Sequence, residues 1–205
     1  MKSYVIHIFR SMPSQGTAEG RYVGRAQSPL AQGAVAELAG LKREHRYPEA
    51  ELYCASPSIS CVDTLKILYP QAEPEVVLDL AECDFGDWEN KTAEELKDEP
   101  GFAQWLAGKG APPNGESGQV FFQRVCKGFQ LLVQNMMARG TASAVLVTHA
   151  GVMTSILAAF GLPQGEPQDW LCDPGFGYSV RITPTLWMRE PVMEVFALAP
   201  ERIEL

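Results

Sequence analysis

The first candidate for chemistry in this sequence is an arginine at the end of a short apolar run. Arg10 closes the run YVIHIF at residues 4–9, and the polar turn SMPS follows it. An apolar strand that ends in an arginine and a polar turn is a common start of a phosphate-binding loop, because guanidinium pairs well with phosphate oxygens. The residue after the arginine is Ser11, which is a weak nucleophile unless a base activates it. Whether the protein is an enzyme therefore depends on what surrounds Ser11.

Other polar residues follow similar apolar runs, which predicts a layered fold. Together with 4–9, the runs 51–55, 76–80 and 144–148 are short, rich in β-branched or aromatic residues, and predicted as buried strands. Apolar spacing predicts helices at 33–46, 59–69 (capped by Ser56), 117–138 and 151–161. Two further strands, near 178–183 and 192–198, are expected to form a hairpin. We predict an α/β protein, a three-layer α/β/α sandwich around a mostly parallel sheet.

Ligands of open α/β sheets bind beyond the carboxyl ends of the strands. The residues that follow the predicted strands are Arg10, Ser11, Ser60, Glu82 and His149. We therefore expect these side chains to line one cleft. His149 lies at a strand-to-helix turn and is a functional candidate, although such a residue can also be an ordinary hydrogen-bonded turn residue.

Composition limits the classes of partner. The chain has 205 residues and a formal net charge of −8, which argues against nucleic-acid and anionic-membrane surfaces. No apolar stretch is long enough to span a membrane. The five cysteines are widely spaced without a C-x-x-C pair, so we expect reduced cysteines in a cytoplasmic protein and no metal. Nothing in the sequence specifies an oligomeric state.

Residues 84–117 interrupt the alternation of strands and helices with Gly, Pro, Trp and charged residues. We expect this segment to be an excursion over one edge of the sheet, and we interpret it as a lid. The sequence contains no repeat and no linker. Residues 1–205 are therefore predicted to be a single domain.

Five motifs, in order along the chain, resemble those of the histidine phosphatase superfamily, which has the phosphoglycerate mutase-like fold. They are FRSMPSQGTAEGRYVGRAQSPL at 9–30, SPSISCVDTL at 56–65, LAECDFGDWEN at 80–90, PNGES with the RV pair at 124–125, and VTHAGV at 147–152. In that family these segments correspond to R-H-G with G-R-x-x-G, S-P-L-x-R-A-x-x-T-A, L-x-E-x-x-F-G-x-W-E-G, P-x-G-E-S and V-S-H-G-G-V. The resemblance covers nearly the whole chain. It implies a phosphorylated small molecule, or a phosphate or sulfate anion, as ligand, and it implies no cofactor.

The resemblance also assigns roles to residues that match the family's motifs. Arg10 matches the arginine of R-H-G, and Arg21 matches the arginine of G-R-x-x-G. His149 matches the second histidine, which with the arginines holds the phosphoryl oxygens. Glu82 matches the acid that protonates the leaving oxygen.

Several positions depart from the family's pattern. Ser11 stands where the family has the nucleophilic histidine, and Ser60 stands where it has a second phosphate-binding arginine. Met12 and Ala150 replace glycines, and Thr17 replaces a usual asparagine. The resemblance therefore implies a phosphate-ester pocket without the standard phosphohistidine chemistry.

Two functions remain open on this basis. The first is a catalytically impaired or inactive protein that binds a phosphorylated molecule or a protein partner. The alternative is an active phosphomonoesterase, of the sugar-phosphate or alpha-ribazole-phosphate type, with altered chemistry around His149 and Glu82. A chance match on a different α/β fold is the third possibility.

Overall fold

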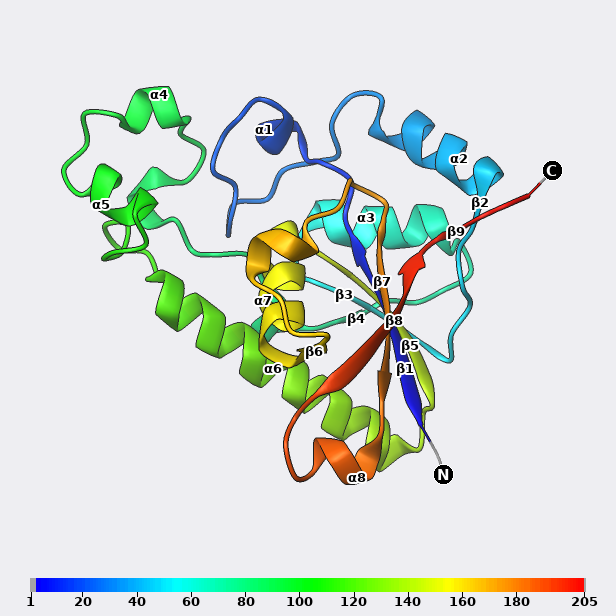
Figure 1. Ribbon diagram of the computed structural model, residues 1–205. Helices are drawn as coiled ribbons and strands as arrows, with labels where there is room; N and C mark the ends of the chain where they lie inside the picture. Colours follow the sequence, from blue (N-terminus) through cyan, green and yellow to red (C-terminus); the bar gives the residue numbers. More distant parts are fainter. Residues whose placement is uncertain (1–2, 205) are drawn as a thin grey trace.

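A seven-stranded sheet forms the centre of the computed structural model, which describes residues 3–204 (Figure 1). Its strands in spatial order are β4 (Glu75–Val76), β3 (Leu52–Ala55), β5 (Ser143–Thr148), β1 (Tyr4–Arg10), β7 (Gly177–Ile182), β8 (Met193–Ala199) and β6 (Gly161–Leu162). Within these residues β7 alone runs against the others, since it pairs antiparallel with β1 and β8 while the remaining neighbours are parallel. The predicted mostly parallel sheet is confirmed.

Four long helices cover the two faces of this sheet and complete the three predicted layers. They are α2 (Ala34–Glu44) and α3 (Ile59–Leu68) on one face, and α6 (Gly118–Arg139) and α7 (Ala150–Phe160) on the other (Figure 1). The helix predicted at 117–138 is capped by Ser117, whose hydroxyl accepts from the Val120 amide at 3.2 Å. It ends at Gly140, whose φ of 75° is readily adopted by glycine.

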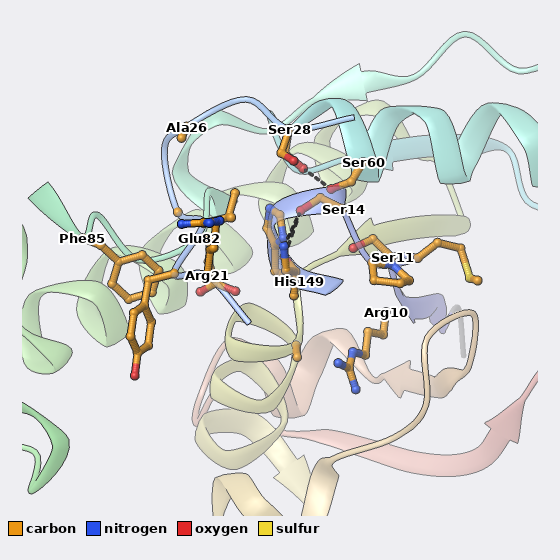
Figure 2. A pocket seen from close by; sticks show the side chains of 18 residues that line it. Arg10, Ser11, Ser14, Arg21, Ala26, Ser28, Ser60, Glu82, Phe85 and His149 are labelled. Atoms are coloured by element: carbon orange, nitrogen blue, oxygen red, sulfur yellow. Dashed lines mark hydrogen bonds between the residues drawn. The ribbon is translucent and has the colours of Figure 1, made fainter. Parts of the chain in front are cut away.

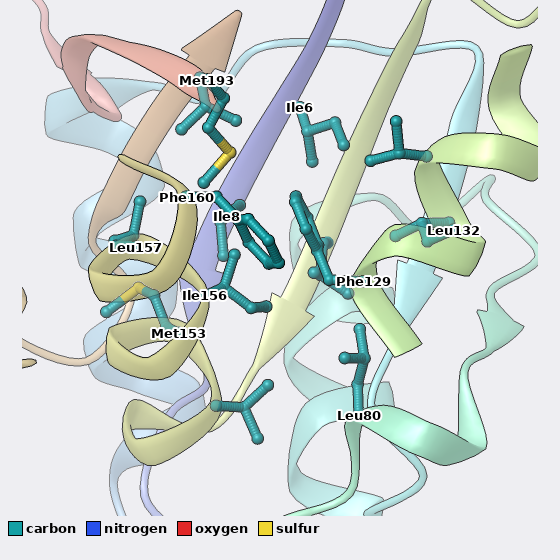
Figure 3. Packing of buried hydrophobic residues seen from close by; sticks show 14 of the residues in the cluster. Ile6, Ile8, Leu80, Phe129, Leu132, Met153, Ile156, Leu157, Phe160 and Met193 are labelled. Atoms are coloured by element: carbon teal, nitrogen blue, oxygen red, sulfur yellow. The ribbon is translucent and has the colours of Figure 1, made fainter. Parts of the chain in front are cut away.

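Alternating side chains along the central strands separate two cores. Ile6, Ile8 and Leu146 point into the cluster beneath α6 and α7, where they pack with aromatic and aliphatic residues of both helices (Figure 3). Val145 and Val147 point to the opposite face and pack with α2 and α3. Successive side chains of a strand face opposite sides, so apolar runs in β1 and β5 bury both faces.

The remaining elements are short. The helices are α1 (Gln15–Ala18), α4 (Ala93–Leu96), α5 (Phe102–Leu106) and α8 (Pro184–Trp187), and the 3-10 helices are η1 (Leu78–Leu80), η2 (Gly86–Trp88) and η3 (Pro167–Trp170). A separate two-stranded sheet pairs β2 (His45–Arg46) with β9 (Glu201–Arg202). The predicted hairpin near the end of the chain is confirmed as β7 and β8, with α8 between them.

The strand predicted at 76–80 is wrong beyond its first residue. The ladder of β4 ends at Val76, one further bond joins the Val77 amide to the Ala55 carbonyl, and η1 follows. The chain leaves the sheet here to pass closely over α6, where a Cβ on Gly128 would lie 2.6 Å from that of Asp79. Tertiary packing against α6 therefore overrides the local strand preference.

The cap predicted for α3 is also displaced. The N-cap is Ser58, whose side chain accepts from the Cys61 amide at 3.2 Å. The Ser56 hydroxyl instead donates to the Leu80 carbonyl at 2.5 Å and lies 2.7 Å from the Thr148 hydroxyl. Ser56 thus links the ends of the chain segments that carry the candidate residues, rather than starting the helix.

The excursion at 84–117 has a small core of its own. Trp88, Leu96 and Phe102 are buried together, and Tyr22 and Trp105 pack against them. The elements α4 and α5 lie to one side of the sheet in Figure 1. That this segment acts as a lid stays a prediction.

All five cysteines are free, as the sequence predicted. Among residues 3–204, no helix is both long enough and apolar enough to cross a bilayer.

Gly177 offers a test of the β1–β7 pairing. A Cβ at this position would lie 1.8 Å from the Ile8 carbonyl oxygen, so Gly177→Ala must push the two strands apart. We expect a loss of about 2–4 kcal/mol in the free energy of unfolding, measured by urea denaturation. Gly118→Ala is the matched control, because no atom lies within 4 Å of its Cβ and it sits in the first turn of α6. Equal unfolding midpoints for the two variants would contradict this strand pairing.

Candidate functional site

A cleft of about 200 Å³ opens at the carboxyl ends of β1, β3 and β5 (Figure 2). Its lining includes every residue that the sequence assigned to the site, namely Arg10, Ser11, Thr17, Arg21, Ser60, Glu82, His149 and Ala150. The predicted convergence of these residues on one cleft is confirmed, while their chemical roles stay predictions.

The register of β1 against β5 brings the two central residues of the cleft together. Arg10 pairs with Thr148, and the Ser11 amide donates to the Thr148 carbonyl at 2.8 Å. Ser11 and His149, which follow these paired residues, therefore leave the sheet side by side. Figure 2 shows both close to Ser60.

Ser11 is almost fully buried, at 8% exposure. Its neighbour Met12 is completely buried, packs in the core beneath α2 and α3, and donates its amide to the Thr64 hydroxyl at 3.0 Å. The Met12 side chain is therefore packed in the core, although the residue also forms part of the cleft lining. Ser11 places a side-chain hydroxyl at the position of the family's nucleophile, and Ser14 of the same turn also lines the cleft.

Position 60 offers a hydroxyl in place of a cation. Ser60 is 4% exposed and lies in the first turn of α3, with its Oγ 3.2 Å from the Oγ of Ser58. A charge-assisted hydrogen bond contributes about 1.5–3 kcal/mol, roughly twice as much as one between neutral groups. The cleft therefore lacks a strong phosphate contact at this point.

The arginines of the cleft already have protein partners. Arg10 donates from Nη1 to the Cys172 carbonyl at 2.6 Å. Arg21 contacts Glu19 at 3.0 Å, the Asn90 carbonyl at 2.7 Å and Glu95 at 3.3 Å. Arg21 thus links the cleft to the excursion, and its charge is largely balanced by two carboxylates.

Glu82 lies directly against the N-terminus of α7. Its Oε1 accepts from the Cys83 amide at 3.0 Å, and a Cβ on Gly151 would lie 2.8 Å from the same oxygen. The absence of a side chain at Gly151 leaves room for this carboxylate. A carboxyl group at this position could transfer a proton to or from a bound ligand.

Arg124 holds the segment that carries Glu82, a role that sequence reasoning did not find. Its guanidinium donates to the carbonyls of Asp79 and Ala81, each at 2.9 Å, and of Glu82 at 3.1 Å, and it pairs with Glu116. Its appearance within a family-like RV pair was the signal that could have found it.

Glu89 holds the backbone of the opposite wall of the cleft. Sequence reasoning did not find this role either. Its carboxylate accepts from the amides of Gly24, Arg25, Ala26 and Phe85 at 2.8–3.3 Å. Gly24 is required there, since a Cβ would lie 1.8 Å from the Cys83 carbonyl oxygen.

Aromatic side chains form a third feature that the sequence did not predict. Tyr22 and Phe85 both line the cleft, with ring centroids 5.3 Å apart, and Trp105 packs against both from the excursion. One side of the cleft is consequently apolar.

His149 follows the last residue of β5 and is the N-cap residue of α7. Its side chain is partly exposed in the cleft. Its Nε2 lies 3.6 Å from the Sγ of Cys61. Burial by itself would lower the pKa of His149, but the charges of Cys61 and Glu82 raise the pKa to about 9. Near neutral pH this ring is therefore an imidazolium.

Clusters of three or more His, Cys, Asp or Glu side chains that could hold a metal ion do not occur between residues 3 and 204.

Comparison with known proteins agrees with this geometry. A family model for the histidine phosphatase superfamily (branch 1) matches residues 6–188. The adenosylcobalamin/alpha-ribazole phosphatase of Escherichia coli (strain K12) is 24% identical over 175 residues, which is 82% of this chain and 85% of that protein. The chain belongs to the histidine phosphatase superfamily.

Solved structures of other proteins have a similar fold. The alpha-ribazole phosphatase from Shigella flexneri has a TM-score of 0.76 at 21% identity, with 98% of each chain covered. The phosphoglycerate mutase from Bacillus anthracis str. Sterne has a TM-score of 0.76 at 14% identity, with 96% of this chain and 92% of that chain covered. The phosphoglycerate mutase-like fold predicted from the sequence is confirmed.

Glu89 gives a testable consequence of the cleft's architecture. We expect Glu89→Ala to lower the free energy of unfolding by about 2–4 kcal/mol, because four backbone amides lose a charged acceptor. Hydrogen exchange should accelerate at Gly24, Arg25 and Ala26. Glu94→Ala is the control, since Glu94 is exposed and pairs only with Lys97 among the contacts of its side chain described here. Unchanged exchange at the three amides would show that the wall is held by other contacts.

Proposed function

We propose that this protein binds a phosphate ester in the cleft and does not perform phosphohistidine chemistry. The observation that carries the proposal is Ser11 at the nucleophile's position, almost buried beside a histidine whose pKa is raised to about 9 by Cys61 and Glu82. A serine hydroxyl needs a base to become a useful nucleophile, and an imidazolium cannot accept its proton. The loss of a covalent nucleophile lowers turnover by on the order of 10⁶ in well-studied enzymes.

Retained binding is supported by the groups that still line the cleft. Arg10, Arg21 and His149 carry positive charge there, and small residues at positions 11 and 60 leave space. The α7 N-terminus adds a favourable end of the helix dipole for an anion. The names of the relatives point to phosphorylated ligands, alpha-ribazole phosphate among them.

A second candidate is an active phosphomonoesterase with altered chemistry. It is favoured by the presence of both Glu82 and His149 in the same cleft as Ser11. In this alternative Glu82 supplies the proton for the leaving oxygen, and His149 or Ser11 serves as nucleophile. Sugar phosphates and alpha-ribazole phosphate are the substrate types to test.

We expect little or no hydrolysis of an aryl phosphate at neutral pH. The reason is that position 11 lacks an imidazole and position 60 lacks a cation. The measurement is release of the aryl alcohol by the wild type and by His149→Ala. Turnover that His149→Ala abolishes would establish the altered enzyme in place of the inactive binder.

Restoring the missing groups should return some activity only in combination. Ser11→His supplies the nucleophile and Ser60→Arg the second clamp. Each single variant should remain near background, and the double variant should hydrolyse an aryl phosphate and form phosphohistidine, since groups that act as a unit are strongly non-additive.

The matched control for this series is Ser14→His combined with Ser60→Arg, because Ser14 also lines the cleft but is not at the nucleophile's position. A folded double variant that binds phosphate and forms no phosphoenzyme would remove the main support for placing Ser11 at the nucleophile's position.

A further inference from the structure

Cys61 lies directly behind the cleft and has no part in the function proposed above. It is fully buried, while the residue before it, Ser60, lines the cleft. Its Sγ lies 3.6 Å from the Nε2 of His149 and also contacts Ser11. A thiol of this kind therefore stands between the two residues at the centre of the cleft.

The position of Cys61 in α3 favours its ionised form. Cys61 is the third residue of this helix of ten residues, and its amide donates to the cap residue Ser58. The N-terminal end of a helix carries partial positive charge, which stabilises a thiolate. Burial opposes ionisation, but the charge of His149 and hydrogen bonds from His149, Ser58 and Ser11 lower the pKa of Cys61 below its usual value.

The groups around His149 come from four elements. Cys61 on α3 and Glu82 in the segment after η1 favour its protonated form. Burial and the N-terminus of its own helix α7 oppose it, as do Arg10 and any other cation of the cleft. The pKa of about 9 shows that the two anions prevail.

We propose that Cys61 is a positioning residue that holds His149 as an imidazolium through a thiolate–imidazolium pair, and so supplies the cleft with a cation for the phosphoryl group. The proton moves from the Sγ of Cys61 to the Nε2 of His149, and no other bond changes. The contact between the two side chains comes from the geometry, whereas the use of the pair in binding a phosphoryl group rests on the proposed function.

The orientation of the pair gives it a positive end toward the ligand. His149 is partly exposed in the cleft and Cys61 is fully buried behind it. An anion in the cleft is therefore closer to the imidazolium than to the thiolate, and Coulomb attraction to the nearer charge dominates. The pair provides positive charge where Ser60 provides none and where Arg21 is balanced by Glu19 and Glu95.

The pair itself can be tested without any ligand. The chain has three histidines, so the ring nitrogens of His149 can be assigned by NMR with His7 and His45 as internal references. In the wild type we expect His149 to lose its proton near pH 9 and the far-ultraviolet absorbance of a thiolate to be present at neutral pH. Cys61→Ser keeps the size of the side chain but cannot form the thiolate, so the absorbance should vanish and the His149 midpoint should fall by at least about two pH units.

Cys126→Ser is the matched control, because Cys126 lies on α6 outside the cleft lining. It should keep the thiolate absorbance and the His149 titration midpoint of the wild type. Equal His149 midpoints in the wild type and Cys61→Ser, or no thiolate absorbance lost in Cys61→Ser, would overturn the pair.

Binding is tested with sulfate, because sulfate keeps its double negative charge at every pH used in the experiment. At roughly pH 8 we expect Cys61→Ser to bind sulfate about tenfold more weakly than the wild type, because its His149 is mostly neutral there while the wild-type ring is charged. At roughly pH 5, where both rings are charged, the difference should largely disappear. Equal affinities at both pH values would overturn the role of the pair in binding, and absence of sulfate binding by the wild type would overturn the proposed function while leaving the pair intact.

Discussion

The parallel pairing of β1 with β5 is the constraint on which the site depends. Its register sets Arg10 opposite Thr148, so the residues that follow, Ser11 and His149, leave the sheet at the same point. The bond from the Ser11 amide to the Thr148 carbonyl extends the ladder one step beyond the strands. A slip of one residue would turn the side chains of β1 to the other face and exchange the two cores, which is why the apolar runs specify this register strongly.

Around this pairing, two charged side chains bind the backbone of the cleft walls. Arg124 binds three carbonyls of the segment that carries Glu82, and Glu89 binds four amides of the opposite wall. Backbone groups in loops have no ladder to satisfy them, and buried ones are costly if left without partners. These two residues therefore let irregular segments form the walls of a cleft.

The fold of this chain does not by itself set the chemistry of the site. Alternation of apolar residues and helix packing preserve a phosphoglycerate mutase-like fold at 14% identity to a solved relative. Membership of the superfamily does not decide activity, because function resides in particular side chains and not in the scaffold. At the centre of this cleft two serines and a buried cysteine surround a histidine with a raised pKa, which is an arrangement suited to holding an anion.

The sequence by itself determined the α/β class, the order of the main elements and the convergence of the candidate residues. These follow from local apolar periodicity and from the rule that ligands bind at the carboxyl ends of parallel strands. Only the tertiary structure decided that residues 78–80 leave the sheet, that Ser58 rather than Ser56 caps α3, and that Met12 is a core residue. The pairing of Cys61 with His149 likewise joins residues 88 positions apart. Contacts of this kind depend on how helices and loops pack across the sheet, and local sequence patterns carry no information about which distant side chain will fill a given space.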